Sequence, residues 1–243
     1  MTEISDGIRI LDGTTDIVVV APHGPLIDGK FENDVRTSII GEEIHRLLGC
    51  FTIINDRFFK PKGPVKKDAK QYFLDLYRVD HSAKVAGYME AIRHVADSDK
   101  KSLVLWLHGI FDQFAIDRAK EHMELGLYEG PPENLQALIA YGQGGDPKTG
   151  VTRDSLSARQ ATVDRFSAML NKSGIQTILT HPHCNNYRGR DAKRFNQWFI
   201  NNGYNHDQVE SIQLELKESG LRDTKENAVQ TARLLASILM ALN

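Results

Sequence analysis

Short runs of apolar, often β-branched residues alternate with segments of helical periodicity along this 243-residue chain. The run at 17–21 reads IVVVA, and such an uninterrupted run is typical of a parallel strand that is buried on both faces. Further strands are expected at 51–54, 103–107, 138–141, 175–180 and 211–216, and helical patterns lie at 34–48, 83–96, 155–172, 191–201 and 224–242. This alternation predicts a single α/β domain over residues 1–243, with three layers (αβα) and a mixed, mostly parallel twisted sheet.

The composition excludes several classes of partner. Lys and Arg number 30 against 32 Asp and Glu, so the net charge of −2 gives no basic surface for nucleic acid. Cys50 and Cys184 form no CxxC motif, and residues 1–13 lack the basic and apolar regions of a signal peptide. No apolar run approaches the ~20 residues that span a bilayer. We therefore expect a cytoplasmic protein with no nucleic-acid or membrane partner, and the oligomeric state stays open.

Two histidines occupy matching positions, because each follows an apolar run and precedes a glycine. They are His23 and His108, and the carboxyl ends of parallel strands meet at one edge of a sheet. An acidic group, Asp28, Glu32 and Asp34, lies in the segment before the first helix. Two histidines and one carboxylate, with an open fourth position, form a usual ligand set of catalytic zinc. The sequence predicts one divalent metal ion, Zn²⁺, and leaves open which carboxylate is the middle ligand.

A second metal-binding candidate is the HPHC sequence at 181–184, since His and Cys both bind zinc. The alternative for this segment is a place at the rim of the active site, where His183 would contact the substrate. Arg78, Arg188 and Arg190 are candidates for binding a substrate carboxylate, because the planar guanidinium matches a carboxylate with two hydrogen bonds. These arginines favour a small anionic substrate.

Glu215 is the candidate catalytic carboxylate. In the QLEL sequence at 213–216, the period of two places Gln213 and Glu215 on the same face of the expected strand. Polar groups on such a strand are costly to bury unless they are paired or functional, so Glu215 could act as a general acid or base. The alternative is a carboxylate on the solvated face of an edge strand.

A series of short motifs occurs in one order: APHG (21–24), ENDVRT (32–37), IINDRF (53–58), DLYR (75–78), LHG (107–109), NYRGRD (186–191) and IQLELKESGLR (212–222). Their content and order resemble the N-formylglutamate amidohydrolase family, zinc-dependent hydrolases akin to the metallocarboxypeptidases and the phage poly-γ-glutamate hydrolases. The resemblance spans residues 17–235. The family often has Ser at the position of Gly24 and Asn at that of Tyr77.

The resemblance implies a phosphorylase/hydrolase-like fold and zinc held by His23, an acidic residue of the 32–34 stretch, and His108. Alignment on the helix that follows favours Asp34, and a count from His23 favours Asp28, with Glu32 between them. Glu215 would be the catalytic residue. The implied activity is hydrolysis of the amide of an N-acylated or γ-linked acidic amino acid.

Two other functions compete with this hypothesis. One is a catalytically silent metal- or ligand-binding protein of the same fold, because a fold does not determine a function. The other is a phosphate-ester enzyme built on the YGQGG loop at 141–145, which lacks the Lys and Ser/Thr of a phosphate-binding loop.

The stretch at 112–152 follows the His108 strand, where lids of active sites commonly lie, so we expect it to cover the metal site.

Overall fold

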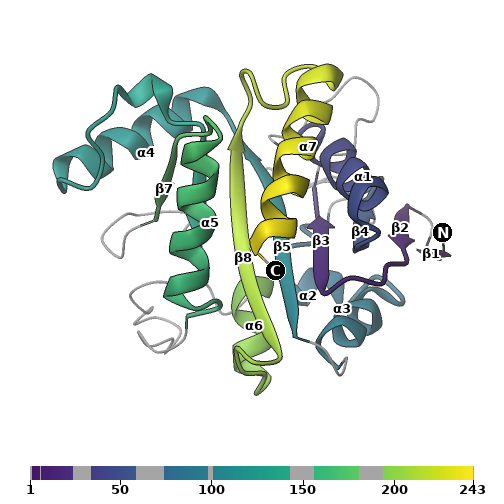
Figure 1. The fold of residues 1–243 in the computed structure, drawn as a ribbon. Helices are drawn as coiled ribbons and strands as arrows, with labels where there is room; N and C mark the ends of the chain where they lie inside the picture. Colours follow the sequence, from purple (N-terminus) through teal and green to yellow (C-terminus); the bar gives the residue numbers. More distant parts are fainter. Residues whose placement is uncertain are drawn as a thin grey trace.

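The computed structural model of the chain describes residues 2–5 (backbone only), 7–23, 34–58, 74–97, 101–142, 156–180 and 194–242. Within these residues one sheet contains β1 (Thr2–Ser5), β2 (Ile8–Leu11), β3 (Ile17–Ala21), β4 (Phe51–Asn55), β5 (Ser102–Ile110), β6 (Ala137–Ala140), β7 (Thr177–Leu179) and β8 (Val209–Lys217). The strand order is β1-β2-β4-β3-β5-β8-β6-β7 (Figure 1). The pairs β3–β4, β3–β5, β5–β8 and β6–β7 are parallel, and β1–β2, β2–β4 and β6–β8 are antiparallel. The predicted mixed α/β sheet is confirmed.

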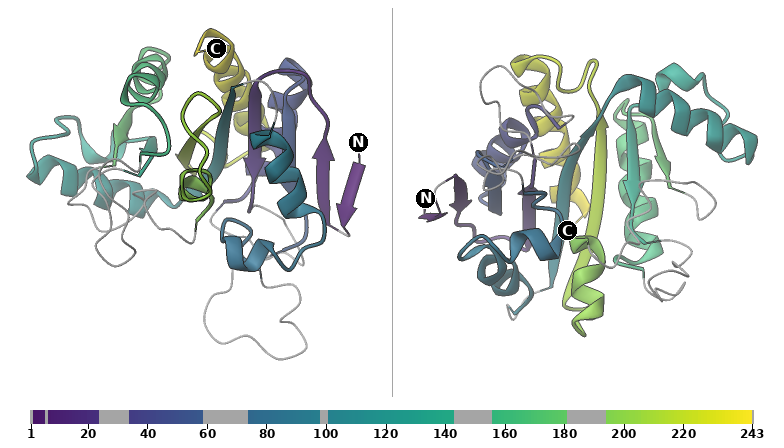
Figure 2. Two further views of the ribbon diagram at one scale, coloured as in Figure 1. Left: turned by 90° about the horizontal axis from the view of Figure 1, so that it is seen from below. Right: turned by 180° about the vertical axis from the view of Figure 1, so that it is seen from behind.

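Helices cover both faces of the sheet. They are α1 (Thr37–Leu48), α2 (Val79–Ser82), α3 (Tyr88–Ala96), α4 (Asp112–Glu124), α5 (Gln160–Lys172), α6 (Phe195–Asn201) and α7 (Lys225–Leu242), with a 3-10 turn, η2, at Pro132–Asn134. Figure 2 shows α7 (yellow) and α4 (teal) on opposite sides of the sheet. None of the described helices combines the length and the apolar character that crossing a membrane requires.

The core consists of two main layers because adjacent residues of a strand point to opposite faces. Val19 of β3 packs in the cluster formed with α1, α5 and α7, whereas Val20 packs in the cluster formed with α3 and α6. A smaller cluster joins α4 to β6 and β7. Both neighbours of β3 are parallel strands, so an apolar side chain is needed at every position of its IVVVA sequence.

Four of the predicted helices begin several residues later than expected, and those at 34–48 and 191–201 begin at Thr37 and Phe195. The helix predicted at 83–96 begins at Tyr88, because Gly87 adopts a left-handed conformation (φ 76°) and separates α3 from the short α2. The helix predicted at 155–172 begins at Gln160, and its N-cap is Arg159. Residue 155, where the predicted helix starts, lies outside the described residues. The β1–β2 hairpin and α4 were not predicted.

The segment at 112–152 contains regular structure. It begins with α4 and η2, and it then forms β6, which pairs with both β8 and β7 inside the sheet. Residues 137–140 are therefore part of the scaffold. The lid stays a prediction for the rest of the segment, whose residues 143–152 lie outside the described part of the chain.

The packing of α5 on the sheet gives a stability test. Leu170 is fully buried in the core, so Leu170→Ala should lower the free energy of unfolding by about 2–5 kcal/mol, as the lost methyl groups leave a cavity. Urea unfolding measures this loss. The exposed Lys172 of the same helix is a matched control, and Lys172→Ala should change stability by less than about 0.5 kcal/mol. Equal effects of the two substitutions would contradict the described packing.

Candidate metal centre

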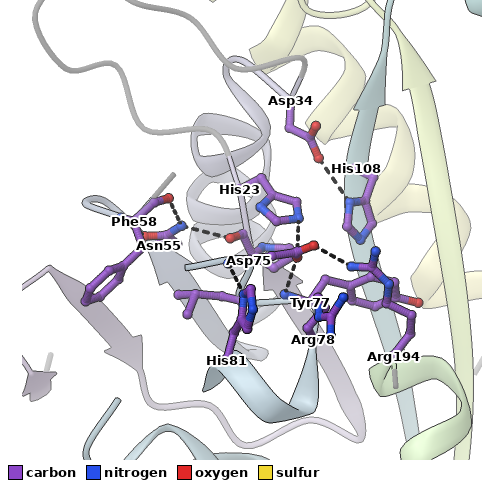
Figure 3. Close-up of polar contacts among 12 residues, drawn as sticks. His23, Asp34, Asn55, Phe58, Asp75, Tyr77, Arg78, His81, His108 and Arg194 are labelled. Carbon is purple, nitrogen blue, oxygen red and sulfur yellow. Dashed lines mark hydrogen bonds and ion pairs between the residues drawn. The ribbon is translucent and has the colours of Figure 1, made fainter. Parts of the chain in front are cut away.

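Three buried side chains converge at one edge of the sheet: His23, Asp34 and His108 (Figure 3). Each offers one potential ligand atom, and these atoms all lie within 4.8 Å of one another. Nδ1 of His108 lies 3.0 Å from Oδ2 of Asp34, and the two imidazole rings are 5.1 Å apart between centroids. Among the three acidic candidates, the structure thus brings Asp34 to the histidines, while Asp28 and Glu32 lie outside the described residues.

Strand pairing places the two histidines together. His108 lies near the end of β5, and His23 follows the end of the adjacent parallel strand β3 by two residues. Asn55, at the end of β4, fixes the chain at this point: its Nδ2 donates to the carbonyl oxygens of Pro22 (2.8 Å) and Phe58 (2.7 Å). The IINDRF motif therefore contributes an amide that holds the residue before His23.

Thr37 connects the backbone segments that carry His23 and Asp34. Its buried Oγ1 lies 2.9 Å from the carbonyl oxygens of both His23 and Asp34, and its backbone N donates to the same Asp34 carbonyl. Thr37 is also the first residue of α1. The ENDVRT motif thus supplies both a carboxylate and the hydroxyl that fixes its backbone beside His23.

Asp75 of the DLYR motif contacts the imidazole of His23. Its Oδ1 is 3.3 Å from Nε2 of His23, and its Oδ2 is paired with Nη1 of Arg194. The backbone N of Asp75 donates to Nδ1 of His81 at 2.9 Å. A carboxylate on one ring nitrogen orients an imidazole so that the other nitrogen can bind a metal.

The protonation state of His23 suits a metal ligand. Complete burial lowers the pKa of His23 and outweighs the opposite effect of the carboxylates of Asp34 and Asp75. The imidazole is therefore neutral near pH 7, which is the form that binds metal ions.

The residues fit a divalent ion of the zinc type. Nε2 of His108 is buried and accepts or donates no hydrogen bond within the described part of the chain, although buried polar atoms normally have a partner. Two imidazoles and a carboxylate are the donor set of catalytic zinc sites. His23, Asp34 and His108 could therefore hold the ion.

Glu215 lies on the strand next to His108. β8 pairs with β5 in parallel, and His108 and Glu215 are direct partners in the register. Nε2 of Gln213 donates to Oε1 of Glu215, and the hydroxyl of Tyr77 donates to Oε1 of Gln213 at 3.0 Å. Burial raises the pKa of Tyr77 well above its usual value, so this hydroxyl stays protonated. The alternative of a solvated carboxylate on an edge strand is wrong, because β8 is internal and Glu215 is buried.

The predicted substrate arginines fare differently. Arg78 forms an ion pair with Asp80 (2.7 Å) and lowers the pKa of that carboxyl to about 2. Arg188, Arg190 and His183, together with the rest of the HPHC sequence, lie outside the described residues. Arg194 pairs with Asp75 and lies 5.8 Å from the centre of the Tyr77 ring, and it was not among the predicted residues.

Asp75 was also missed, although it lies in a motif that was considered only for its arginine. Its signal was the carboxylate at the start of DLYR, but a contact with His23 across 52 residues has no local pattern. Arg194 gave even less signal, since it differs from other surface arginines only by its contacts.

Solved structures of several other proteins share this fold. No protein-family model matches the chain, and neither does any curated protein. An N-formylglutamate amidohydrolase from Ralstonia eutropha matches with a TM-score of 0.58 at 13% identity, covering 97% of this chain and 96% of that one. A gene product of Agrobacterium tumefaciens matches with a TM-score of 0.59 at 10% identity, covering 98% and 95%.

A Burkholderia mallei protein, provisionally described as a carboxypeptidase, has a TM-score of 0.52 at 12% identity. It covers 97% of this chain but only 59% of the other. The chain shares its fold with the N-formylglutamate amidohydrolase. These likenesses support the family resemblance at the level of the fold, as the motifs predicted.

The Thr37 hydroxyl offers a test of how the site is held. Thr37→Val keeps the shape of the side chain but leaves the buried carbonyl oxygens without this donor, so the free energy of unfolding should fall by about 1–3 kcal/mol. Urea unfolding of the metal-free protein measures the change. Thr37→Ser, which keeps the hydroxyl, is the control and should lose less. A Thr37→Val variant as stable as the wild type would contradict this role.

Proposed function

We propose that the protein is a zinc-dependent amidohydrolase that cleaves the amide bond of an N-acylated or γ-linked acidic amino acid, a substrate similar to N-formylglutamate. The observation that carries the proposal is the buried cluster of His23, Asp34 and His108 with Glu215 on the neighbouring strand. The fold shared with an N-formylglutamate amidohydrolase supports it. The cytoplasm stays the expected compartment.

In this proposal each side chain has a distinct task. Zinc in such a site supplies a Lewis acid that polarises a carbonyl oxygen and lowers the pKa of water. The Glu215 carboxylate accepts a proton from the water that adds to the carbonyl carbon. It then donates this proton to the nitrogen as the carbon–nitrogen bond breaks. The amide of Gln213 holds the carboxylate in place during both transfers.

The substrate is proposed to be small and anionic. Arg194 is partly exposed and pairs through Nη1 with Asp75, the partner of His23. It adds a described cation to the candidates Arg188 and Arg190, and a substrate carboxylate would share it with Asp75. Arg78 is a weaker candidate than the sequence suggested, because its guanidinium already binds Asp80 with two hydrogen bonds. A substrate carboxylate would have to displace that partner.

Metal content tests the ligand set. The wild-type protein should retain about one zinc ion per chain, and His23→Ala or His108→Ala should remove it, since each loses one of three protein ligands. Elemental analysis after dialysis measures this loss. The exposed His94 on α3 is a matched control, and His94→Ala should keep the metal. Loss of zinc from His181→Ala and His183→Ala alone would instead favour the HPHC segment.

Glu215→Gln tests the catalytic role. The variant should bind zinc as the wild type does, but kcat should fall about 10²–10⁴-fold, because the amide cannot carry the proton. Hydrolysis of N-formylglutamate, N-acylaspartate and poly-γ-glutamate measures the rate. Full activity of the variant would contradict the role. Zinc binding by the wild type without turnover of any substrate would favour the silent binding protein.

A further inference from the structure

Arg222 is a fully buried arginine whose guanidinium binds backbone carbonyl groups. Its Nε donates to the carbonyl oxygen of Leu216 (3.0 Å), Nη1 to that of Val35 (3.0 Å), and Nη2 to that of Ile110 (2.9 Å). Burying a cation is costly unless its donors are satisfied, so an arginine is expected here only if these bonds compensate for the lost hydration.

Each of these carbonyl groups lies beside a residue of the candidate site. Val35 directly follows Asp34, and Leu216 directly follows Glu215. The third carbonyl belongs to the last residue of β5, two positions after His108. A single planar group therefore connects the three chain segments that carry the middle ligand, the second histidine and the catalytic carboxylate.

A second arginine, Arg36, binds the backbone of Arg222. Nη1 of Arg36 donates to the carbonyl oxygen of Arg222 at 3.0 Å. Arg36 has a φ of 65°, the left-handed conformation that residues other than glycine rarely adopt. It is the N-cap of α1, two residues after Asp34. The backbone conformation of the acidic segment is thus coupled to the loop that carries Arg222.

The glycine after His108 leaves room for the guanidinium. A Cβ atom at Gly109 would lie 2.4 Å from Cζ of Arg222, far inside van der Waals contact. The guanidinium cannot move away without losing hydrogen bonds, because Nε, Nη1 and Nη2 of Arg222 all donate to carbonyl oxygens. The glycine of the LHG motif is thereby explained by contact with a residue more than a hundred positions away.

We propose that Arg222 is a positioning residue that sets the spacing of Asp34, His108 and Glu215, and through it the affinity of the site for zinc. This inference rests on the proposed zinc site. Arg222 touches the backbone of the three segments, so it acts through their placement rather than on the substrate. Replacing it should disturb the three segments together.

Zinc affinity of full-length variants, measured by competition with a chelator, tests the proposal. Arg222→Met removes all three donors, Arg222→Lys keeps the charge but not the planar fork, and Gly109→Ala displaces the guanidinium without changing it. We expect each to weaken zinc binding about 10- to 100-fold, the usual range for residues that orient metal ligands. Gly109→Ala and Arg222→Lys keep the test decisive if Arg222→Met fails to fold.

Leu170→Ala separates positioning from general loss of stability. Leu170 is fully buried on α5, so this variant should be destabilised, but it should bind zinc as the wild type does. Each affinity is measured at a temperature where the metal-free variant is folded. Affinity losses in the Arg222 and Gly109 variants no larger than that of Leu170→Ala would overturn the proposal.

Hydrogen exchange of the metal-free protein distinguishes this inference from the proposed function. Arg222→Met should reduce amide protection at 34–37, 108–111 and 215–217 together, whereas Leu170→Ala should not. Loss of protection confined to the loop at 218–222 would overturn the inference. If the wild type binds no zinc, the proposed function fails, and the exchange result still decides whether Arg222 joins the three segments.

Discussion

The parallel pairing of β3, β5 and β8 is the constraint on which the candidate site depends. These strands are neighbours in the sheet, and all three run in the same direction. His23 follows the first, and His108 and Glu215 are register partners near the ends of the other two. Because the strands are internal, these side chains are buried at one edge instead of being spread over a solvated surface.

The polar side chains of the candidate site are buried, so they need hydrogen-bond partners or a bound ion. Buried imidazoles and carboxylates are costly unless they are hydrogen-bonded, paired or bound to a metal. Asp75 pairs with His23, and Gln213 donates a hydrogen bond to Glu215. The hydroxyl of Thr37 lies within hydrogen-bond distance of the carbonyl oxygens of His23 and Asp34. Nε2 of His108 has no hydrogen-bond partner among the described residues, and Nδ1 of the same ring lies close to Asp34, which is consistent with a site that holds a cation.

The sequence pattern predicted the strands and the faces on which their side chains lie, because both depend on residues close together in the chain. The apolar runs identified β3 and β5, and the period of two put Gln213 and Glu215 on one face. The end of α5 was predicted at Lys172, as observed. The start of α3 was predicted five residues too early, because the helical periodicity continues through Gly87, whose left-handed conformation breaks the helix. Asp75 and Arg222 were not predicted, since their roles come from contacts with residues distant in the chain.

His23, Asp34 and His108 are proposed to bind one zinc ion together. X-ray absorption at the zinc edge, recorded on the zinc-loaded protein, tests this most directly, because it reports the elements in the coordination shell. If these three residues are the ligands, the spectrum should show nitrogen and oxygen neighbours only, at about 2.0–2.2 Å, with the multiple scattering of two imidazoles. A sulfur neighbour at about 2.3 Å would contradict it, since none of the three residues carries sulfur and Cys184 of the HPHC segment does.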